Sequence, residues 1–331
     1  MTDITNNPIY TDETAARRFL EELRWPNGVL CVHCGAFGDD IAAVEKTGKR
    51  TKPPTPGKRY RPAREGLYYC NACKKQFSVT VGTVMEDSHI PLHKWAYAYR
   101  VFLGAKNGIS AHEMHRTIGV SYKSAWYLGH RIRESLRRGG LAPPIMGGSQ
   151  SKVVEADETF IGRKKDVAKQ RGYRHKHAVL TLIDRTSGEA RSFHIDEANA
   201  ANIVPIVRAN VARETTVATD EAAYYSGLNR EYYHGAVNHG ADEWVVGEFH
   251  TNSAENYFSL FKRSIRGTYS HVSEKHLHRY LAEFDFRYSN RAKLGVDDKR
   301  RTERALRGIE GKRLTYRRPN GTRQRADDAP A

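Results

Sequence analysis

The stretch KVVEADETFI, residues 152–161, decides the fold of the larger part of this chain. Its small and apolar residues are typical of a buried strand, yet the strand carries Asp157 in its middle. A carboxylate taken alone is more often a solvated surface group, but an acid within an apolar strand indicates a functional site. The segments that follow show which sheet this strand belongs to.

Two further strands are predicted directly downstream, at HAVLTLID (177–184) and EARSFHI (189–195). The residues RTSG between them form a turn signal, so the two strands make a hairpin. Apolar residues at helical spacing predict a helix over 198–212, and TTVATD at 215–220 predicts another short buried strand. Three strands, a helix and a strand in this order indicate an α/β domain with a mixed sheet.

Acids converge in this predicted domain from separate elements. Asp157 lies on the first strand and Asp220 at the end of the strand after the helix. A further strand is predicted over 232–237, and a helix over about 252–266 carries Glu255. Three such acids can hold two Mg²⁺ or Mn²⁺ ions, which prefer carboxylate oxygens, and so predict metal-dependent phosphoryl transfer.

Each predicted aspartate ligand has an acidic neighbour, Glu158 beside Asp157 and Glu221 beside Asp220. Either member of each pair is a candidate ligand. Adjacent side chains on an extended strand point to opposite faces, so we expect only one acid of each pair to reach the metal site.

Helices are predicted upstream of residue 140. Ser110 and Ser121 each begin a segment of helical spacing, and a short glycine-containing turn separates the two segments. Arg131 and Arg133 lie near the end of the second helix and are expected to contact DNA if the pair is a helix-turn-helix. Many helical hairpins share this pattern without binding DNA. The sequence LAPPIMGGSQS, 141–151, is predicted to be a linker.

The only four cysteines of the chain form two pairs of identical spacing, Cys31 with Cys34 and Cys70 with Cys73. Such pairs are typical of a tetrahedral zinc site in a zinc ribbon, and the alternative is two structural or redox pairs. A basic, proline-rich stretch at 46–64 separates the pairs and is expected to be an extended loop.

The chain has 331 residues, which exceeds one ordinary domain, and a net charge of +16. With 39% hydrophobic residues it can build cores, so the charge indicates a folded protein with a polyanionic partner. It contains no apolar run long enough for a membrane span and no signal-peptide pattern at its start, MTDITNNPIY. We therefore expect a protein of the cytoplasm, with DNA or RNA within reach.

Five units are predicted along the chain. They are a zinc ribbon with its basic insertion (1–82), a helix-turn-helix region (83–140), the linker (141–151), a catalytic domain (152–291) and a basic, flexible tail (292–331). Lysines and arginines next to the predicted acids are expected to contact DNA phosphates, since such contacts supply affinity without sequence information. These residues are Arg163, Lys164, Lys165, Arg263 and Arg266.

Several stretches carry a resemblance to a known family. They are the two cysteine motifs, the second continuing as CKKQF (73–77), GTV (82–84) through Trp95, EADETFIG (155–162), HTNSAENYFSLFKRSIRG (250–267) and YLAEFDFRYSN (280–290). Together they span about residues 15–291 and resemble the zinc-ribbon DDE insertion-sequence transposases of bacteria and archaea, of the ISXO type. The resemblance implies an RNase H-like catalytic domain preceded by a zinc ribbon and a helix-turn-helix region.

The resemblance also implies a function. It identifies Asp157, Asp220 and Glu255 as a DDE triad and Lys262, seven residues after Glu255, as a contact to a phosphate. We therefore expect a transposase that binds the terminal inverted repeats of its element, cuts and joins DNA with Mg²⁺ or Mn²⁺, and acts as a homo-oligomer because two ends are handled together.

Alternatives remain open at this stage. Asn252 and Asn256 flank Glu255 and are alternative third ligands. A transposase-derived DNA-binding regulator with a decayed site is the first alternative function, and an RNase H-like endonuclease without transposition is the second.

Overall fold

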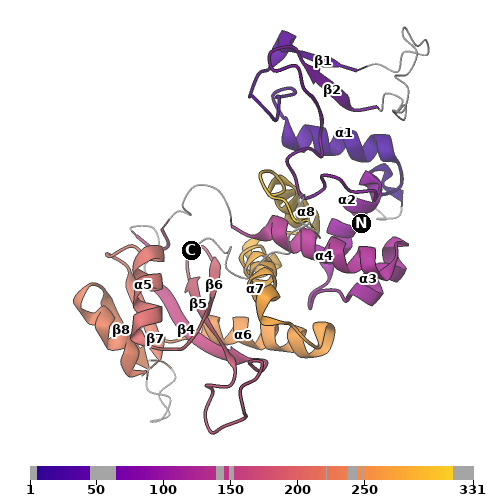
Figure 1. The fold of residues 1–331 in the computed structure, drawn as a ribbon. Helices are drawn as coiled ribbons and strands as arrows, with labels where there is room; N and C mark the ends of the chain where they lie inside the picture. Colours follow the sequence, from indigo (N-terminus) through magenta and orange to yellow (C-terminus); the bar gives the residue numbers. More distant parts are fainter. Residues whose placement is uncertain are drawn as a thin grey trace.

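The computed structural model shows a small sheet at one end of the molecule, a helical unit in the middle and a larger sheet at the other end (Figure 1). The basic insertion at 46–64, Glu221 and most of the predicted linker lie outside the residues that the structure describes. The described residues are 6–44, 65–138, 145–148, 153–220, 222–237, 245, 247 and 249–315.

The larger sheet has the strand order β6-β5-β4-β7-β8, with β4 in the centre. β4 pairs antiparallel with β5, and β5 antiparallel with β6, whereas β4, β7 and β8 are parallel to one another. Every strand predicted from residue 152 onward is present, so the mixed sheet of the RNase H-like type is confirmed. The bounds are β4 Val153–Ile161, β5 His177–Asp184, β6 Ala190–Ile195, β7 Thr216–Asp220 and β8 Tyr233–Val237.

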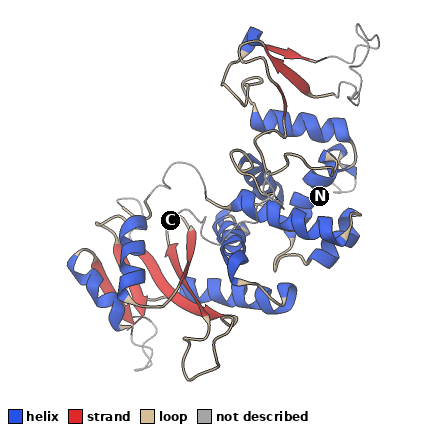
Figure 2. Ribbon diagram, viewed as in Figure 1, coloured by secondary structure: helices blue, strands red, loops and turns tan. Residues whose placement is uncertain are grey.

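Both faces of this sheet are covered by helices, which Figure 2 shows in blue around the red strands. Val154 packs in one buried cluster with α5 (Ala200–Asn210). Ile161 packs in a second cluster, on the other face, with α6 (Asn252–Ser264) and α7 (Glu274–Ser289). Because both faces are buried, β4 and β5 are apolar along most of their length rather than alternating with polar residues.

The small sheet is antiparallel and lies beside α1 (Glu13–Arg24). Its strands are β1 (Ile41–Ala43), β2 (Leu67–Cys70) and β3 (Gln76–Ser78), in the order β1-β2-β3. The third strand directly follows the second cysteine pair. Such a short sheet has little core of its own, and so it needs further support from its cysteines.

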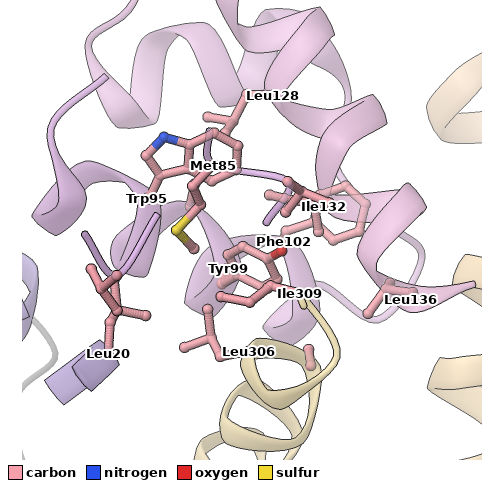
Figure 3. Packing of buried hydrophobic residues seen from close by; sticks show 14 of the residues in the cluster. Leu20, Met85, Trp95, Tyr99, Phe102, Leu128, Ile132, Leu136, Leu306 and Ile309 are labelled. Atoms are coloured by element: carbon pink, nitrogen blue, oxygen red, sulfur yellow. The ribbon is translucent and has the colours of Figure 1, made fainter. Parts of the chain in front are cut away.

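The helical unit contains α2 (Leu92–Gly104), α3 (Ala111–Ile118) and α4 (Tyr122–Leu136). Ser110 and Ser121 are the N-caps of α3 and α4, and each side chain accepts a hydrogen bond from a main-chain N–H of the first turn. The two predicted helix starts are therefore confirmed. Figure 3 shows the core that these helices share, with Trp95 and Tyr99 of α2 facing Ile132 of α4.

The prediction of a flexible tail over 292–331 is wrong for its first half. α8 (Asp298–Arg307) is a helix whose Leu306, followed by Ile309, packs into the core of the helical unit (Figure 3). Basic composition concealed a few apolar residues at helical spacing, which are enough to bury one face. Residues 316–331 lie outside the described part of the chain.

α7 connects the larger sheet to the helical unit. Its Glu283 is fully buried and accepts a hydrogen bond of 2.8 Å from Nε of Arg133 on α4. Arg287, one turn later, donates to the main-chain oxygen of Ala105 after the end of α2 at 2.7 Å. Among the described helices, none is both long enough and apolar enough to cross a bilayer.

Candidate functional site

The acids of the larger sheet meet where the pairing of β4 with β7 ends, in the middle of β4 and at the carboxyl end of β7. The pairing of these parallel strands ends at Glu155 opposite Ala218, so the two strands are not paired with each other beyond that point. Asp157 and Asp220 each lie two residues further along their own strand. One carboxylate oxygen from each of Asp157, Glu158 and Asp220 lies within 4.8 Å of the others. The structure thus brings together the two predicted aspartates.

The expectation that only one acid of the pair Asp157 and Glu158 reaches the site is wrong. Both carboxylates belong to the cluster, and the Tyr225 hydroxyl, from the 3₁₀ helix Ala223–Arg230, donates a hydrogen bond of 2.7 Å to Glu158. The rule of alternating faces fails here because the edge of β4 is no longer paired with β7. Side chains from both faces of β4 can therefore turn into the space between β4 and β7. The corresponding neighbour of Asp220 is Glu221, which the structure does not describe.

The clustered carboxylates disfavour one another's ionisation. Burial, followed by the negative charges of Glu158 and Asp220, raises the pKa of Asp157 to about 8. Burial also raises the pKa of Glu158 to about 7, although the hydrogen bond from Tyr225 opposes this rise. Oxygen ligands whose charges repel each other are the donor set that hard divalent cations such as Mg²⁺ prefer, so these residues fit the predicted metal ions.

Glu255 approaches the acids from α6. It lies in the first turn of the helix, on its exposed side, and is not part of the group within 4.8 Å. Its charge nevertheless contributes to the raised pKa of Asp157, which places the two carboxylates near one another. Asn252 and Asn256 of the same helix are exposed as well.

Glu155 holds the start of α6 against β4. Its carboxylate oxygen Oε2 accepts hydrogen bonds from the main-chain N–H groups of Ser253 and Ala254 at 2.8 and 3.0 Å. Its other oxygen accepts one of 2.6 Å from Nε of Arg185, and this arginine also donates to the main-chain oxygen of His250. Glu155 is two residues before Asp157, on the same face of the strand, so this anchor fixes α6 beside the acids.

Sequence reasoning missed this role of Glu155 and treated the residue only as part of a motif. One signal was present: a second acid at a spacing of two on a strand that is otherwise apolar. Both acids therefore had to face the same side of the sheet.

The four cysteines come together as predicted. The Sγ atoms of Cys31 and Cys73 are 3.6 Å apart, as are those of Cys34 and Cys70, and all four lie within 4.8 Å of one another. Zinc–sulfur bonds of about 2.3 Å in a tetrahedron place the sulfurs about 3.8 Å apart. The cluster therefore fits a zinc ribbon.

Comparison with known proteins agrees with this geometry. Residues 149–289 match the family of the ISXO2-like transposase domain. The domain built on the larger sheet is thus similar to this family, and it is called the transposase domain for that similarity. The chain is also 28% identical, over 299 residues, to an uncharacterized protein in transposable element ISH50 of Halobacterium salinarum. This match covers 84% of this chain and 91% of that protein. The resemblance to ISXO-type transposases is thereby confirmed.

Two solved structures are similar in part. A chain of the simian T-cell lymphotropic virus intasome in complex with PP2A regulatory subunit B56 gamma has a TM-score of 0.27 and 10% identity, over 52% of this chain and 63% of that one. A chain of the Mos1 strand transfer complex has a TM-score of 0.20 and 11% identity, over 61% of this chain and 78% of that one. The fold assignment of the transposase domain rests on its strand order and on the family match.

A basic cavity lies at the end of β4, and one of its lining residues, Lys262, interacts electrostatically with Asp157. Lys262 and Arg266 of the α6 region and Lys176, next to β5, line a cavity of about 260 Å³ at the end of β4. Lys262, Arg263 and Arg266 also line an open groove of about 580 Å³ along α6. Burial and then the positive charge of Arg266 lower the pKa of Lys262. Three of the predicted phosphate contacts are thus gathered at one place.

The loop between β4 and β5 presents the other three predicted contacts of the transposase domain. Arg163 and Lys165 are exposed, and Arg163 donates to the main-chain oxygen of Val167 within the loop. Lys164 is half-buried and donates from Nζ to the main-chain oxygen of Asp196 at 2.8 Å. The exposed pair therefore remains a prediction for DNA contact, whereas Lys164 also fastens the loop to the sheet.

The prediction that Arg131 and Arg133 contact DNA is corrected by their burial. Arg131 is 7% exposed and donates to the main-chain oxygens of Glu86 and Leu314. Arg133 is 4% exposed and pairs with Glu283, with its guanidinium 4.1 Å from the ring centre of Tyr280. Both side chains are used inside the protein, so neither is available to a phosphate.

Proposed function

We propose that this chain cuts and joins DNA at the ends of an insertion sequence, with two divalent cations held by Asp157, Asp220 and Glu255. The observation that carries the proposal is the convergence of half-buried acids where the pairing of β4 with β7 ends, in a domain that matches a transposase family. Glu158 joins this ligand set because it lies in the same cluster.

The chain's own residues divide the work in this proposal. Bound Mg²⁺ ions would supply activation of the attacking water or 3′-hydroxyl and stabilisation of the leaving oxygen. Lys262 and Arg266 bind the phosphates on either side of the scissile bond, since they line the basic cavity at the end of β4 and Lys262 interacts electrostatically with Asp157. The hydroxyl of Tyr225 orients Glu158, and Glu155 keeps α6 in place.

For recognition of the terminal repeats, we propose the zinc ribbon and the start of α4. In a helix-turn-helix, the first residues of the second helix meet the base edges in the major groove. Tyr122 and Lys123 are exposed at that position, and the ring of His112 on α3 packs 4.3 Å from the Tyr122 ring. They replace the buried arginines of α4 as expected DNA contacts. Two repeats must be handled together, so we also propose that the chain acts as a homo-oligomer.

The test is Mg²⁺-dependent cleavage of a plasmid that carries the element's own flanking repeats. Wild type should cut at the repeat ends, and Asp220→Asn and Glu255→Gln should reduce cleavage at least about a hundredfold while binding to the repeats persists. Asn256→Ala is the matched control, because this exposed residue is next to Glu255, and it should cut like wild type.

Three results contradict parts of the proposal. Cleavage by Glu255→Gln at the wild-type rate means that Glu255 is not a ligand. Binding to the repeats without any cleavage by wild type means a DNA-binding regulator. Cleavage without joining of the released ends to a target plasmid means an endonuclease that does not transpose.

A further inference from the structure

Two histidines and one acid form a second cluster in the transposase domain. His177 is the first residue of β5, His194 lies on the neighbouring strand β6, and Glu274 is the first residue of α7. One ligand atom from each lies within 4.8 Å of the other two. The histidine rings are 5.4 Å apart between centres and are nearly perpendicular, at 66°.

One ring nitrogen of each histidine in this cluster lacks a hydrogen-bond partner. His177 is 4% exposed, and its Nδ1 atom has no hydrogen-bond partner; the same holds for the buried Nε2 atom of His194. A buried polar atom left without a hydrogen-bond partner destabilises the fold, and folded proteins keep few such atoms. Two such nitrogen atoms belong to one cluster that also contains a carboxylate. A metal ion accepts electron pairs from all three groups and would therefore satisfy them together.

We propose that His177, His194 and Glu274 bind a divalent transition-metal ion, and that this ion is zinc. Two imidazole nitrogens and one carboxylate oxygen are a common zinc ligand set, which leaves a fourth position to water. Glu274 is exposed, so a water molecule can reach that position. Nitrogen ligands favour zinc over Mg²⁺, which keeps the two metal sites of the domain chemically separate.

This site is also separate in space from the acid cluster. On β5, His177 pairs with Ile161 of β4, whereas Asp157 pairs with Thr181. Four residues along a strand correspond to about 13 Å. No residue is shared between the two clusters.

The expected role of the ion is to clamp α7 to the sheet. Its ligands come from two adjacent strands and from the first residue of the helix. The same helix carries Glu283, which pairs with Arg133 of the helical unit. A metal at the start of α7 therefore stabilises the helix through which the DNA-cutting domain contacts the rest of the chain.

The test is the zinc content of the full chain, measured by elemental analysis after exhaustive dialysis. Wild type should hold about two zinc ions, one in the ribbon and one here, and His194→Ala should hold about one. His271→Ala, which removes an exposed histidine nearby, is the matched control and should still hold about two. One zinc ion in wild type, or equal zinc in wild type and His194→Ala, overturns the proposal.

A second variant guards against misfolding of the first. Glu274 is exposed at a helix start, so Glu274→Gln should leave the fold intact while zinc affinity of this site falls at least about tenfold, in competition with a chromogenic chelator. An unchanged affinity removes Glu274 from the site and overturns the assignment. The readout is independent of DNA cleavage, so its failure and that of the proposed function are distinguishable.

Discussion

Replacing Asp157 by asparagine should stabilise the protein in the absence of Mg²⁺ while abolishing cleavage. The folded carboxyl holds its proton to about pH 8, because of burial and the neighbouring acids, whereas its ordinary pKa is 3.8. The folded state therefore binds this proton more tightly than the unfolded state. Its contribution to stability is present at low pH and is lost as the pH rises from about 4 towards about 8.

The magnitude follows from that interval. Each pH unit within it lowers the free energy of unfolding by about 1.4 kcal/mol, so at pH 7 the native Asp157 costs the metal-free protein about 4 kcal/mol. Asparagine carries no charge but must still find hydrogen-bond partners in the same place. We therefore expect Asp157→Asn to raise the free energy of unfolding by about 2–4 kcal/mol at pH 7, and by much less at pH 4.

The assay is urea denaturation at pH 4 and pH 7 in buffer without Mg²⁺, with the variant compared with wild type at the same pH because the zinc affinity of the ribbon also depends on pH. Glu197→Gln, which neutralises an exposed acid of the same domain, is the control and should change little. Added Mg²⁺ should stabilise wild type through binding but not Asp157→Asn. If the variant is no more stable than wild type at pH 7 without Mg²⁺, the acids do not repel one another as their arrangement indicates.

Three further perturbations test other parts of the structure. Glu155→Ala leaves Arg185 without its buried partner and α6 without its anchor. The free energy of unfolding, measured by urea denaturation, should therefore fall by about 3–5 kcal/mol, and a loss below about 1 kcal/mol would contradict the role of Glu155 as an anchor. Glu283→Gln leaves Arg133 buried without a carboxylate, and a loss of similar size is expected; an unchanged midpoint would exclude a stabilising contact between α4 and α7. Cys70→Ser should release about one zinc ion per chain and lower the thermal midpoint, and undiminished zinc in elemental analysis would contradict the ribbon.

Local patterns predicted the elements of the fold well. Strands such as β5 are apolar and bounded by turn signals, and the caps at Ser110 and Ser121 are read directly from neighbouring residues. The helix α8 was missed because Leu306 and Ile309 are surrounded by charge, and their burial depends on a core formed by residues some 200 positions earlier. The composition of a segment gives the average polarity of its residues, whereas a helix can be buried along one face by a few apolar side chains.

The site was predicted in part, and the errors share one cause. Asp157 and Asp220 were found because each interrupts an apolar strand. Whether Glu158 joins them depends on where the pairing of β4 with β7 ends, which is a long-range property. Arg133 was expected on the surface because its partner Glu283 is 150 positions away in the sequence. Neighbouring residues do not reveal such partners.

The faces of α6 favour Glu255 over its asparagine neighbours as the third ligand. At about 100° per residue, the buried side chains of this helix, such as Tyr257 and Phe261, define the face that packs on the sheet. Asn252 and Asn256 lie opposite that face and point away from the sheet.

Glu255 and Lys262, seven residues apart, share one flank of the helix instead, within about 20° of each other. Lys262 lines the cavity at the end of β4, and both side chains interact electrostatically with Asp157. That flank is therefore the side of α6 turned towards the acids. In the proposed function, a carboxylate at this position completes the ligand set, and the lysine two turns later holds the phosphate beside it.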